Sequence, residues 1–157
     1  MDILLMTVGK TRIDFVTRGI AEYEKRLTRY VPFSRLELPD IKTGKNVTPD
    51  VQKTQEGNMI LEKISPSDFV VLLDEKGREY TSLEFASWLE KLMVAGRKRT
   101  VFVVGGPYGF SKEVYARADA KLSLSKMTFN HEMVRMFFIE QIYRGMTILR
   151  GEPYHHE

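Results

Sequence analysis

The sequence predicts an α/β domain with a mostly parallel sheet that is covered by helices on both faces. Short apolar runs alternate along the chain with longer segments in which apolar residues recur at helical spacing. The runs 68–74 and 100–106 are apolar almost throughout, which is typical of strands buried on both faces. No internal repeat or linker divides the chain, so its 157 residues are expected to form a single domain, 1–157.

The amino-terminal half is expected to hold two strands and two helices. A buried strand is predicted at 3–9, and an amphipathic helix at 13–30 follows it. Segment 33–39 alternates apolar and polar residues like a half-buried strand and ends at a proline. Gly, Pro and polar residues with few apolar anchors predict a loop at 40–50, and a helix with Pro in its first turn is expected at 49–64.

The carboxy-terminal half continues this alternation. Ser82 and Ser111 are placed to cap two helices, and Gly96 is placed to end the first of them. The final helix is apolar around most of its circumference, which fits a central core helix and equally a helix shared with a second subunit. Its Arg135 and Arg144 are expected either to be solvated or to face a phosphate. The expected elements are strands at 68–74, 100–106 and 120–125, a turn at 75–80, and helices at 82–96, 111–118 and 131–149.

Composition restricts the chemistry open to this chain. The absence of cysteine excludes disulfides, a thiolate nucleophile and cysteine-ligated zinc, and three histidines make a metal site unexpected. No signal-peptide pattern or membrane-spanning segment is visible, so a cytoplasmic protein without a membrane partner is expected. The formal net charge of +3 is compatible with a polyanionic partner. The basic groups are scattered and would bind phosphates only if they converged: Lys10, Arg12, Lys42, Lys45, Arg97, Lys98 and Arg99.

Ligands of doubly wound sheets bind at the carboxyl ends of the strands, which directs attention to Leu73 and Asp74 and to the residues from Gly105 and from Ser125 onward. The segment VVGGPYGF, 103–110, has glycines that let backbone amides approach a ligand, or it is only a tight strand-to-helix turn. It is neither GxGxxG nor a Walker loop, which disfavours a bound triphosphate.

A second candidate segment is LSLSKMTFNH, 122–131, which leads from a strand into the final helix. Its hydroxyl groups and amides suit an adenosine, with Leu124, Met127 and Phe129 as apolar walls. The alternative is a capped connection in which these three side chains belong to the core.

Three segments carry a family resemblance: VVGGPYGF, LSLSKMTFNHEMVR and the terminal EQIYRGMTILRGEPYHHE. Together they resemble the SPOUT-class RNA methyltransferases and, within that class, the ribosomal large subunit methyltransferase H family. VGK at the start, GKN at 44–46 and LLDEKG at 72–77 extend the resemblance along the chain. The resemblance implies an α/β fold with a deep C-terminal trefoil knot, which the rule against knotted chains would have excluded.

The resemblance also implies a homodimer that binds S-adenosylmethionine in the knot and methylates N3 of a pseudouridine in a stem-loop of 23S ribosomal RNA. Carried over by position, Leu73 ends the strand beside the cofactor, and Gly105 and Gly106 form the first knot loop. Tyr154 and His155 match a Tyr-His pair of the family, so an ordered, functional tail is expected. The loop that wraps the cofactor is implied to be Leu124, Ser125, Lys126, Met127, Thr128 and Phe129.

Methyl transfer to nitrogen needs no metal and no covalent enzyme intermediate, only an in-line approach with the atoms held roughly 3 to 3.5 Å apart. The N3 imide is mostly protonated at neutral pH, so the site must remove its proton or stabilise the anion. Arg144, His155 and His156 are the candidates, with His131 behind them, and the base is not assigned among them. His156 stands where Arg or Lys is usual in the family that the chain resembles. An imidazole is only partly protonated near neutral pH, so a permanent cation is expected to be missing there. Asn130 stands where a proline is frequent.

Two other functions fit the residues. A non-catalytic RNA- or ribosome-binding module would keep the fold without the chemistry, and a nucleotide-binding protein would use GGPYG for phosphate but lacks the Walker lysine. An intact cofactor loop together with an intact Tyr-His tail favours an enzyme. Because the domain is minimal and only mildly basic, the assembled 70S ribosome rather than free rRNA is the expected substrate.

Overall fold

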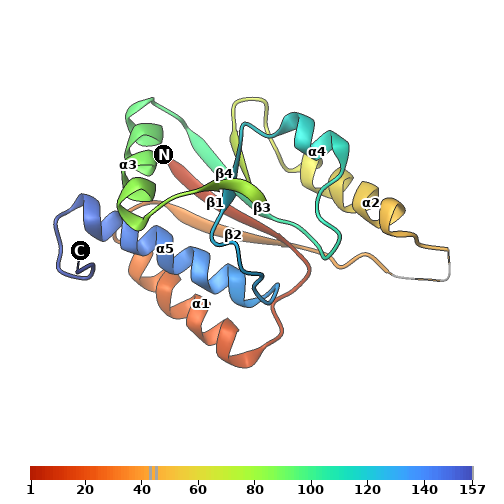
Figure 1. Ribbon diagram of the computed structural model, residues 1–157, viewed down its shortest axis with the longest axis horizontal. Coiled ribbons are helices and arrows are strands. Elements are labelled where there is room, and N and C mark those ends of the chain that lie inside the picture. The colour runs from red at the N-terminus through yellow and green to blue at the C-terminus, as the bar shows by residue number, and fades with distance from the viewer. Residues whose placement is uncertain (43, 45, 157) are drawn as a thin grey trace.

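The computed structural model describes residues 1–42, 44 and 46–156, in which strands and helices alternate along the chain (Figure 1). Thr43, Lys45 and Glu157 lie outside the described residues, and with them one expected basic group and the last residue of the tail. The strands are β1 (Asp2–Val8), β2 (Phe33–Leu38), β3 (Phe69–Glu79), β4 (Arg99–Val104) and β5 (Ala120–Ser123). The helices are α1 (Asp14–Leu27), α2 (Pro49–Glu62), α3 (Ser82–Val94), α4 (Lys112–Arg117) and α5 (Met133–Leu149).

The strands form one parallel sheet in the order β2-β1-β4-β3-β5, as the alternation of elements predicts. β1 has a neighbour on each side: Ile3 is in register with Phe33 of β2 and with Thr100 of β4. In a parallel sheet the carboxyl ends of all strands meet at one edge. Whatever follows these strands in the sequence is therefore gathered at that edge.

Two separate cores cover the two faces of the sheet. Ile3, Leu5 and Phe102 point to one face, where they pack with residues of α1, α3 and α5. Leu4 and Met6 point to the other face, where they pack with α2 and α4. Figure 1 shows α1 and α5 running alongside each other and α2 beside α4. The doubly covered sheet explains why its strands are continuously apolar.

The predicted turn at 75–80 is wrong, because β3 continues to Glu79. Leu122 of β5 pairs with both Leu73 and Arg78, so the residues between these two bulge out of the ladder. A Cβ at Gly77 would lie 2.6 Å from the backbone nitrogen of Leu122, so the bulge can approach β5 only with glycine there. Glycine among charged residues suits a bulge as well as a turn, which explains the error. The trefoil knot implied by the resemblance stays a prediction.

The helix caps differ in one place from those expected. Thr81, and not Ser82, caps α3 in a capping box with Glu84. Ser111 caps α4 by accepting a hydrogen bond from the Val114 backbone nitrogen, as predicted. The start of α5 is held by Asn130, whose Oδ1 accepts hydrogen bonds from the backbone nitrogens of Glu132 and Met133. The Asn130 side chain thereby orders the start of α5, at a position where a proline is frequent in the family that the chain resembles.

Candidate functional site: a pocket at the carboxyl edge and an ordered tail

A pocket of about 720 Å³ opens at the carboxyl edge of the sheet, where β4 and β5 end and β3 bulges after Leu73. Its walls are these parts of the strands, the loop 105–110, the loop 123–130 and the first residues of α5. This volume lies within the range of roughly 300–1,000 Å³ that is usual for small-molecule and cofactor sites. We call it the larger pocket.

The larger pocket gathers most of the residues that the sequence suggested for a cofactor. Those among its lining residues are Leu73, Gly105, Gly106, Leu124, Ser125, Thr128 and Phe129. Lys126 and Met127 belong to the same loop but do not line the pocket. The Met127 side chain is 78% exposed, so it does not provide the apolar wall expected of it. Its backbone nitrogen donates to Ser125 Oγ at 3.0 Å in a turn that directs the side chain outward.

Several lining residues were not singled out from the sequence. Tyr115 lines the larger pocket from α4 and donates a hydrogen bond to Asp74 at the end of the first part of β3. Burial and the bond to Asp74 raise the pKa of the Tyr115 hydroxyl to about 12, so it stays a donor at neutral pH. Tyr108 and Phe110 complete the wall beside the glycine loop. The aromatic residues that follow Gly106 were the feature of the sequence that could have predicted this wall.

The first turn of α5 is anchored to the segment that follows β1. Glu132 Oε1 accepts hydrogen bonds from the backbone nitrogens of Arg12 at 2.6 Å and Ile13 at 2.8 Å. Burial of this carboxyl acts to raise its pKa, but the two backbone donors outweigh that effect and the pKa is lowered. His131, one of the candidate bases, lines the larger pocket directly beside this anchor.

Arg135 has neither of the roles expected for it. Its side chain is buried, and its guanidinium donates to the backbone oxygens of Val8 at 2.8 Å and Gly9 at 2.9 Å. Burial lowers its pKa, and the charge of Glu37 at 3.4 Å acts in the opposite direction. Arg135 thus joins the carboxyl end of β1 to α5, and it is a structural residue because those carbonyl groups need a buried donor.

A smaller pocket of about 360 Å³ adjoins the larger one. The two share Leu122, Ser123, Leu124 and Phe129 as a common wall. The rest of the smaller pocket comes from residues 80–82 and Phe85 and from Phe137, Glu140 and Gln141 of α5. Its polar side joins α3 to α5. Ser82 Oγ of α3 donates to Gln141, and Gln141 donates to Glu140.

The carboxyl-terminal tail is ordered by a network around Glu140. Glu140 Oε1 accepts hydrogen bonds from Arg144 Nη2 at 2.8 Å and from the Tyr154 hydroxyl at 2.9 Å. The ring of Tyr154 packs against Tyr143 and lies under the guanidinium of Arg144. His155 Nδ1 lies 3.1 Å from Arg144 Nη1. The sequence named three of these residues but not Glu140, for which the four-residue spacing to Arg144 was the signal.

The electrostatics of this network assign roles to Tyr154 and His155. Burial, with hydrogen bonds to Tyr23 and Glu140, raises the pKa of the Tyr154 hydroxyl, so Tyr154 is a donor and not a base at neutral pH. Arg144 has only donors, so in its contact with His155 the guanidinium donates and Nδ1 accepts. Arg144 is the permanent cation of the group.

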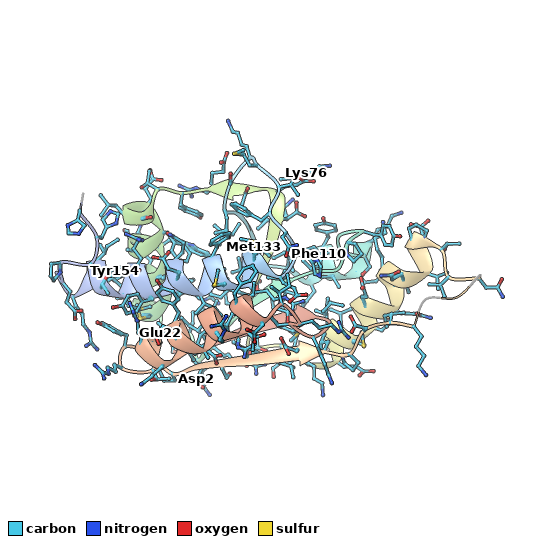
Figure 2. The ribbon with its side chains drawn as sticks, turned by 90° about the horizontal axis from the view of Figure 1, so that it is seen from below. Asp2, Glu22, Lys76, Phe110, Met133 and Tyr154 are labelled. Carbon is cyan, nitrogen blue, oxygen red and sulfur yellow. The ribbon has the colours of Figure 1, made fainter. Side chains whose placement is uncertain are left out.

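The tail and the larger pocket lie toward opposite ends of α5. Figure 2 shows Tyr154 and Met133 at the two ends of this helix. Tyr154, His155, His156 and Arg144 line neither pocket of their own chain. The connection between tail and pockets is indirect and runs through Glu140, which lines the smaller pocket and accepts the hydrogen bond from Tyr154.

The basic groups do not converge on one surface. Lys10 and Arg12 follow the carboxyl end of β1, at the edge that holds the larger pocket, and Arg12 pairs with Asp40 at 2.7 Å. Arg97 and Lys98 precede β4 and therefore lie at the opposite edge of the parallel sheet. Arg99 is held by Asp68 at 2.5 Å. Lys42 follows β2 and so starts from the same edge as Lys10 and Arg12, and Lys76, which was not in this set, lines the larger pocket.

Two absences hold within residues 1–42, 44 and 46–156, the part of the chain that the structure describes. Within these residues no three His, Cys, Asp or Glu side chains are arranged to hold a metal ion. Within the same range no helix has the length and apolar character needed to cross a membrane.

Comparison with known proteins agrees with the resemblance seen in the sequence. The family described as predicted SPOUT methyltransferase matches residues 1–155. A protein of Parabacteroides distasonis named ribosomal RNA large subunit methyltransferase H is 56% identical over the whole of both chains. Proteins with the same name from Porphyromonas gingivalis and Bacteroides fragilis are 50% and 49% identical, again over the whole of both chains. The chain therefore belongs to the SPOUT methyltransferase family, and within it to the ribosomal RNA large subunit methyltransferase H proteins.

Proposed function

We propose that this protein transfers a methyl group from S-adenosylmethionine to N3 of a pseudouridine in 23S ribosomal RNA. The observation that carries the proposal is the larger pocket, formed at the strand ends of a chain that is about half identical over its full length to ribosomal RNA methyltransferases. We further propose that it acts in the cytoplasm as a homodimer.

The lining of the larger pocket fits S-adenosylmethionine. Gly105 and Gly106 leave backbone groups open to a ligand, and Ser125 and Thr128 offer hydroxyl groups to polar edges. Leu73, Leu124 and Phe129 supply apolar surface for a flat base. When bound, the cofactor supplies an electrophilic methyl group on a sulfonium. The chain itself must hold the acceptor in line with that methyl group and exclude water.

The side chains of the tail supply the charge that the acceptor requires. Loss of the N3 proton leaves an anion, which a fixed cation stabilises most when it is held in place before reaction. Arg144 is held in this way by Glu140 and by the ring of Tyr154. His155, His156 and His131 remain the candidates for the group that accepts the proton, and Tyr154 positions Glu140 and Arg144.

A second subunit would bring the tail to a pocket. The tail of one chain lines neither of its own pockets, and α5 keeps exposed apolar surface at Phe137, next to the exposed Phe129. Packing of α5 against its two-fold mate would cover these rings and place the tail of one chain near the larger pocket of the other. Within one chain α5 is a core helix, and its exposed Phe137 supports a further contact with a second subunit.

A non-catalytic ribosome-binding module is the other function that the fold supports, and the larger pocket disfavours it. A binding module has no use for such a pocket, which is lined by most of the residues that the resemblance implies for the cofactor. The tail network with its fixed cation is equally unnecessary for binding alone.

The test is methyl transfer from labelled S-adenosylmethionine onto 70S ribosomes and onto protein-free rRNA, with the modified nucleoside identified by mass. We expect N3-methylpseudouridine from 70S particles and little from free rRNA, because a minimal domain needs a large preformed docking surface. Calorimetric titration with S-adenosylmethionine accompanies it. A folded protein that binds no cofactor and modifies neither substrate would favour the binding module.

A further inference from the structure

Helix α2 buries polar side chains where apolar ones would be expected. Its buried residues are Gln52, Glu56, Gly57 and Ile60, and Glu56 is only 4% exposed. Gln52 and Glu56 are one helical turn apart, so both face the same interior surface. A buried carboxyl group is unfavourable unless hydrogen bonds or opposite charge compensate it, so its retention requires a reason.

Glu56 is poorly compensated by its surroundings. Its Oε2 accepts one long hydrogen bond, from Gln52 Nε2 at 3.4 Å, and its Oε1 is buried with no hydrogen-bond partner among residues 1–42, 44 and 46–156. A charged group that acts on it is Asp40, which follows β2 and is itself paired with Arg12. Burial raises the pKa of the Glu56 carboxyl, the bond from Gln52 acts in the opposite direction, and the negative charge of Asp40 adds to the rise.

The Glu56 carboxyl lies directly against the glycine loop of the larger pocket. A Cβ at Gly106 would lie 2.6 Å from Oε1 and 2.8 Å from Cδ of Glu56, distances that real Cβ atoms essentially never show. Gly106 lines the pocket, and its backbone oxygen accepts a hydrogen bond from the Gly109 nitrogen. The carboxyl group therefore fills the space behind the turn, on the side away from the ligand.

We propose that Glu56 is a positioning residue for the cofactor site, whose carboxyl supports the turn at Gly105 and Gly106 from behind and fixes the backbone that faces the ligand. The proposal rests on the proposed function, because it takes the larger pocket to be the cofactor site. Glu56 touches neither the pocket volume nor the tail, so it acts on cofactor binding and not on the acceptor.

The experiment titrates S-adenosylmethionine calorimetrically into the full-length protein and its variants. Glu56→Ala should weaken binding about tenfold, because a turn without this support must be ordered when the ligand binds. Glu56→Gln keeps the shape and should bind within about twofold of the wild type at neutral pH. Glu62→Ala, at an exposed position of the same helix, is the matched control and should bind normally.

A double variant tests whether Glu56 and Gly106 share one space. Gly106→Ala alone should also weaken binding, since its methyl group collides with the carboxyl. In Glu56→Ala combined with Gly106→Ala the methyl group enters the vacated space, so the combined loss should be smaller than the sum of the two. Additive losses, or normal binding by folded Glu56→Ala, would overturn the proposal.

The pH dependence separates positioning from simple space filling. A proton on Glu56 is bound more tightly in the folded protein, so support of the turn should weaken as the pH rises through the raised pKa. Wild-type affinity for S-adenosylmethionine should therefore fall as the pH rises above the pKa of Glu56. Glu56→Gln has no proton to lose, so its affinity should not fall in this range. Equal pH profiles of the two proteins would contradict the role.

Amide hydrogen exchange makes the result independent of the cofactor. Glu56→Ala should speed exchange at residues 105–109 and leave the amides of β1 unchanged. If the wild type bound no S-adenosylmethionine, the proposed function would fail, but exchange at this loop would still decide the role of Glu56. Unchanged exchange in the loop would rule that role out.

Discussion

The two ends of α5 carry different kinds of site, an open pocket at one end and a side-chain network at the other. At its amino end the larger pocket lies where β4 and β5 end and β3 bulges, and glycines, hydroxyl residues and the charged residues 74–76 line it. At its carboxyl end Tyr154, Arg144 and Glu140 form a dense network of charged and aromatic side chains. The first end offers open volume, and the second offers a cation that neighbouring side chains hold in place.

This difference suggests a division of labour between cofactor and acceptor. An open cradle of backbone groups can bind a ligand of defined shape, and its strength depends on where the backbone lies. A fixed cation can stabilise a charge that exists only during reaction. How much it stabilises that charge depends on the side chains that hold the cation in place. Changes at the amino end should therefore act on cofactor affinity, and changes at the carboxyl end should act on turnover.

Removal of Tyr154 to Glu157 should have the largest effect. We expect methyl transfer to 70S ribosomes to be abolished, because the truncated chain loses His155 and the residue that orients Glu140. Affinity for S-adenosylmethionine should be unchanged, since the tail lines neither pocket of its own chain and in the proposed dimer serves the acceptor and not the cofactor. Transfer assays and calorimetry measure the two quantities, with thermal unfolding as the control for folding. Loss of cofactor binding with an intact fold would dissolve the contrast between the two ends.

Mixing two inactive proteins should restore activity if the ends come from different subunits. One partner lacks the tail, and the other carries Gly105→Val, which drives a branched side chain against the Phe110 ring. Random exchange of subunits gives about a quarter of the wild-type number of complete sites. Labelled methyl transfer after refolding the mixture measures the recovery. No recovery by a mixture shown to contain heterodimers would place both ends of each site in one chain.

Arg135→Met should lower the free energy of unfolding by about 3 kcal/mol, since it leaves buried carbonyl oxygens of Val8 and Gly9 without a donor. Urea denaturation gives this value, and Arg18→Met, at an exposed position of α1, is the control. Transfer by the folded fraction should fall far less than for the truncated tail. A variant of wild-type stability would show that Arg135 is held for another reason.

Glu140→Gln should reduce turnover about tenfold, because a hydrogen bond to a charged partner contributes roughly 1.5–3 kcal/mol and the amide keeps only part of it. The effect should appear in kcat on 70S ribosomes, while S-adenosylmethionine affinity stays normal. Gln141→Ala changes the neighbouring residue and serves as the comparison. A change in cofactor affinity alone would mean that Glu140 belongs functionally to the pockets and not to the tail.

The same contrast explains what could be read from the sequence. The larger pocket was predictable because strand ends, glycines and a hydroxyl-rich loop are local signals, and parallel strands bring them to one edge. Met127 was misplaced because an apolar residue in a loop does not reveal which way a turn directs it. The β3 bulge was missed because its cause, the close approach of Gly77 to Leu122, joins residues that are distant in sequence.

The carboxyl end depended far more on contacts between distant residues. Tyr23 and Tyr154 meet across 131 positions. The amino end has one such contact as well, since Arg135 reaches carbonyl groups 126 and 127 positions away. Spacing within α5 pairs Glu140 with Arg144, but only the folded chain brings Tyr154 onto that pair. Glu56 shows the same limit, since a single Glu on a polar helix gives no sign of burial beside Gly106.

His156 should show the smallest effect and bears on which cation serves the carboxyl end. Its side chain is exposed and the structure gives it no hydrogen bond or ion pair with residues 1–42, 44 and 46–155, whereas Arg144 is held from three sides. His156→Gln should therefore keep methyl transfer within about twofold of the wild type, as is usual for an exposed charge. His156→Arg should bind 70S ribosomes more tightly at low salt, with a salt slope steeper by about one phosphate contact. A loss of tenfold or more in the Gln variant would instead make the imidazole of His156, and not the guanidinium of Arg144, the group on which turnover depends.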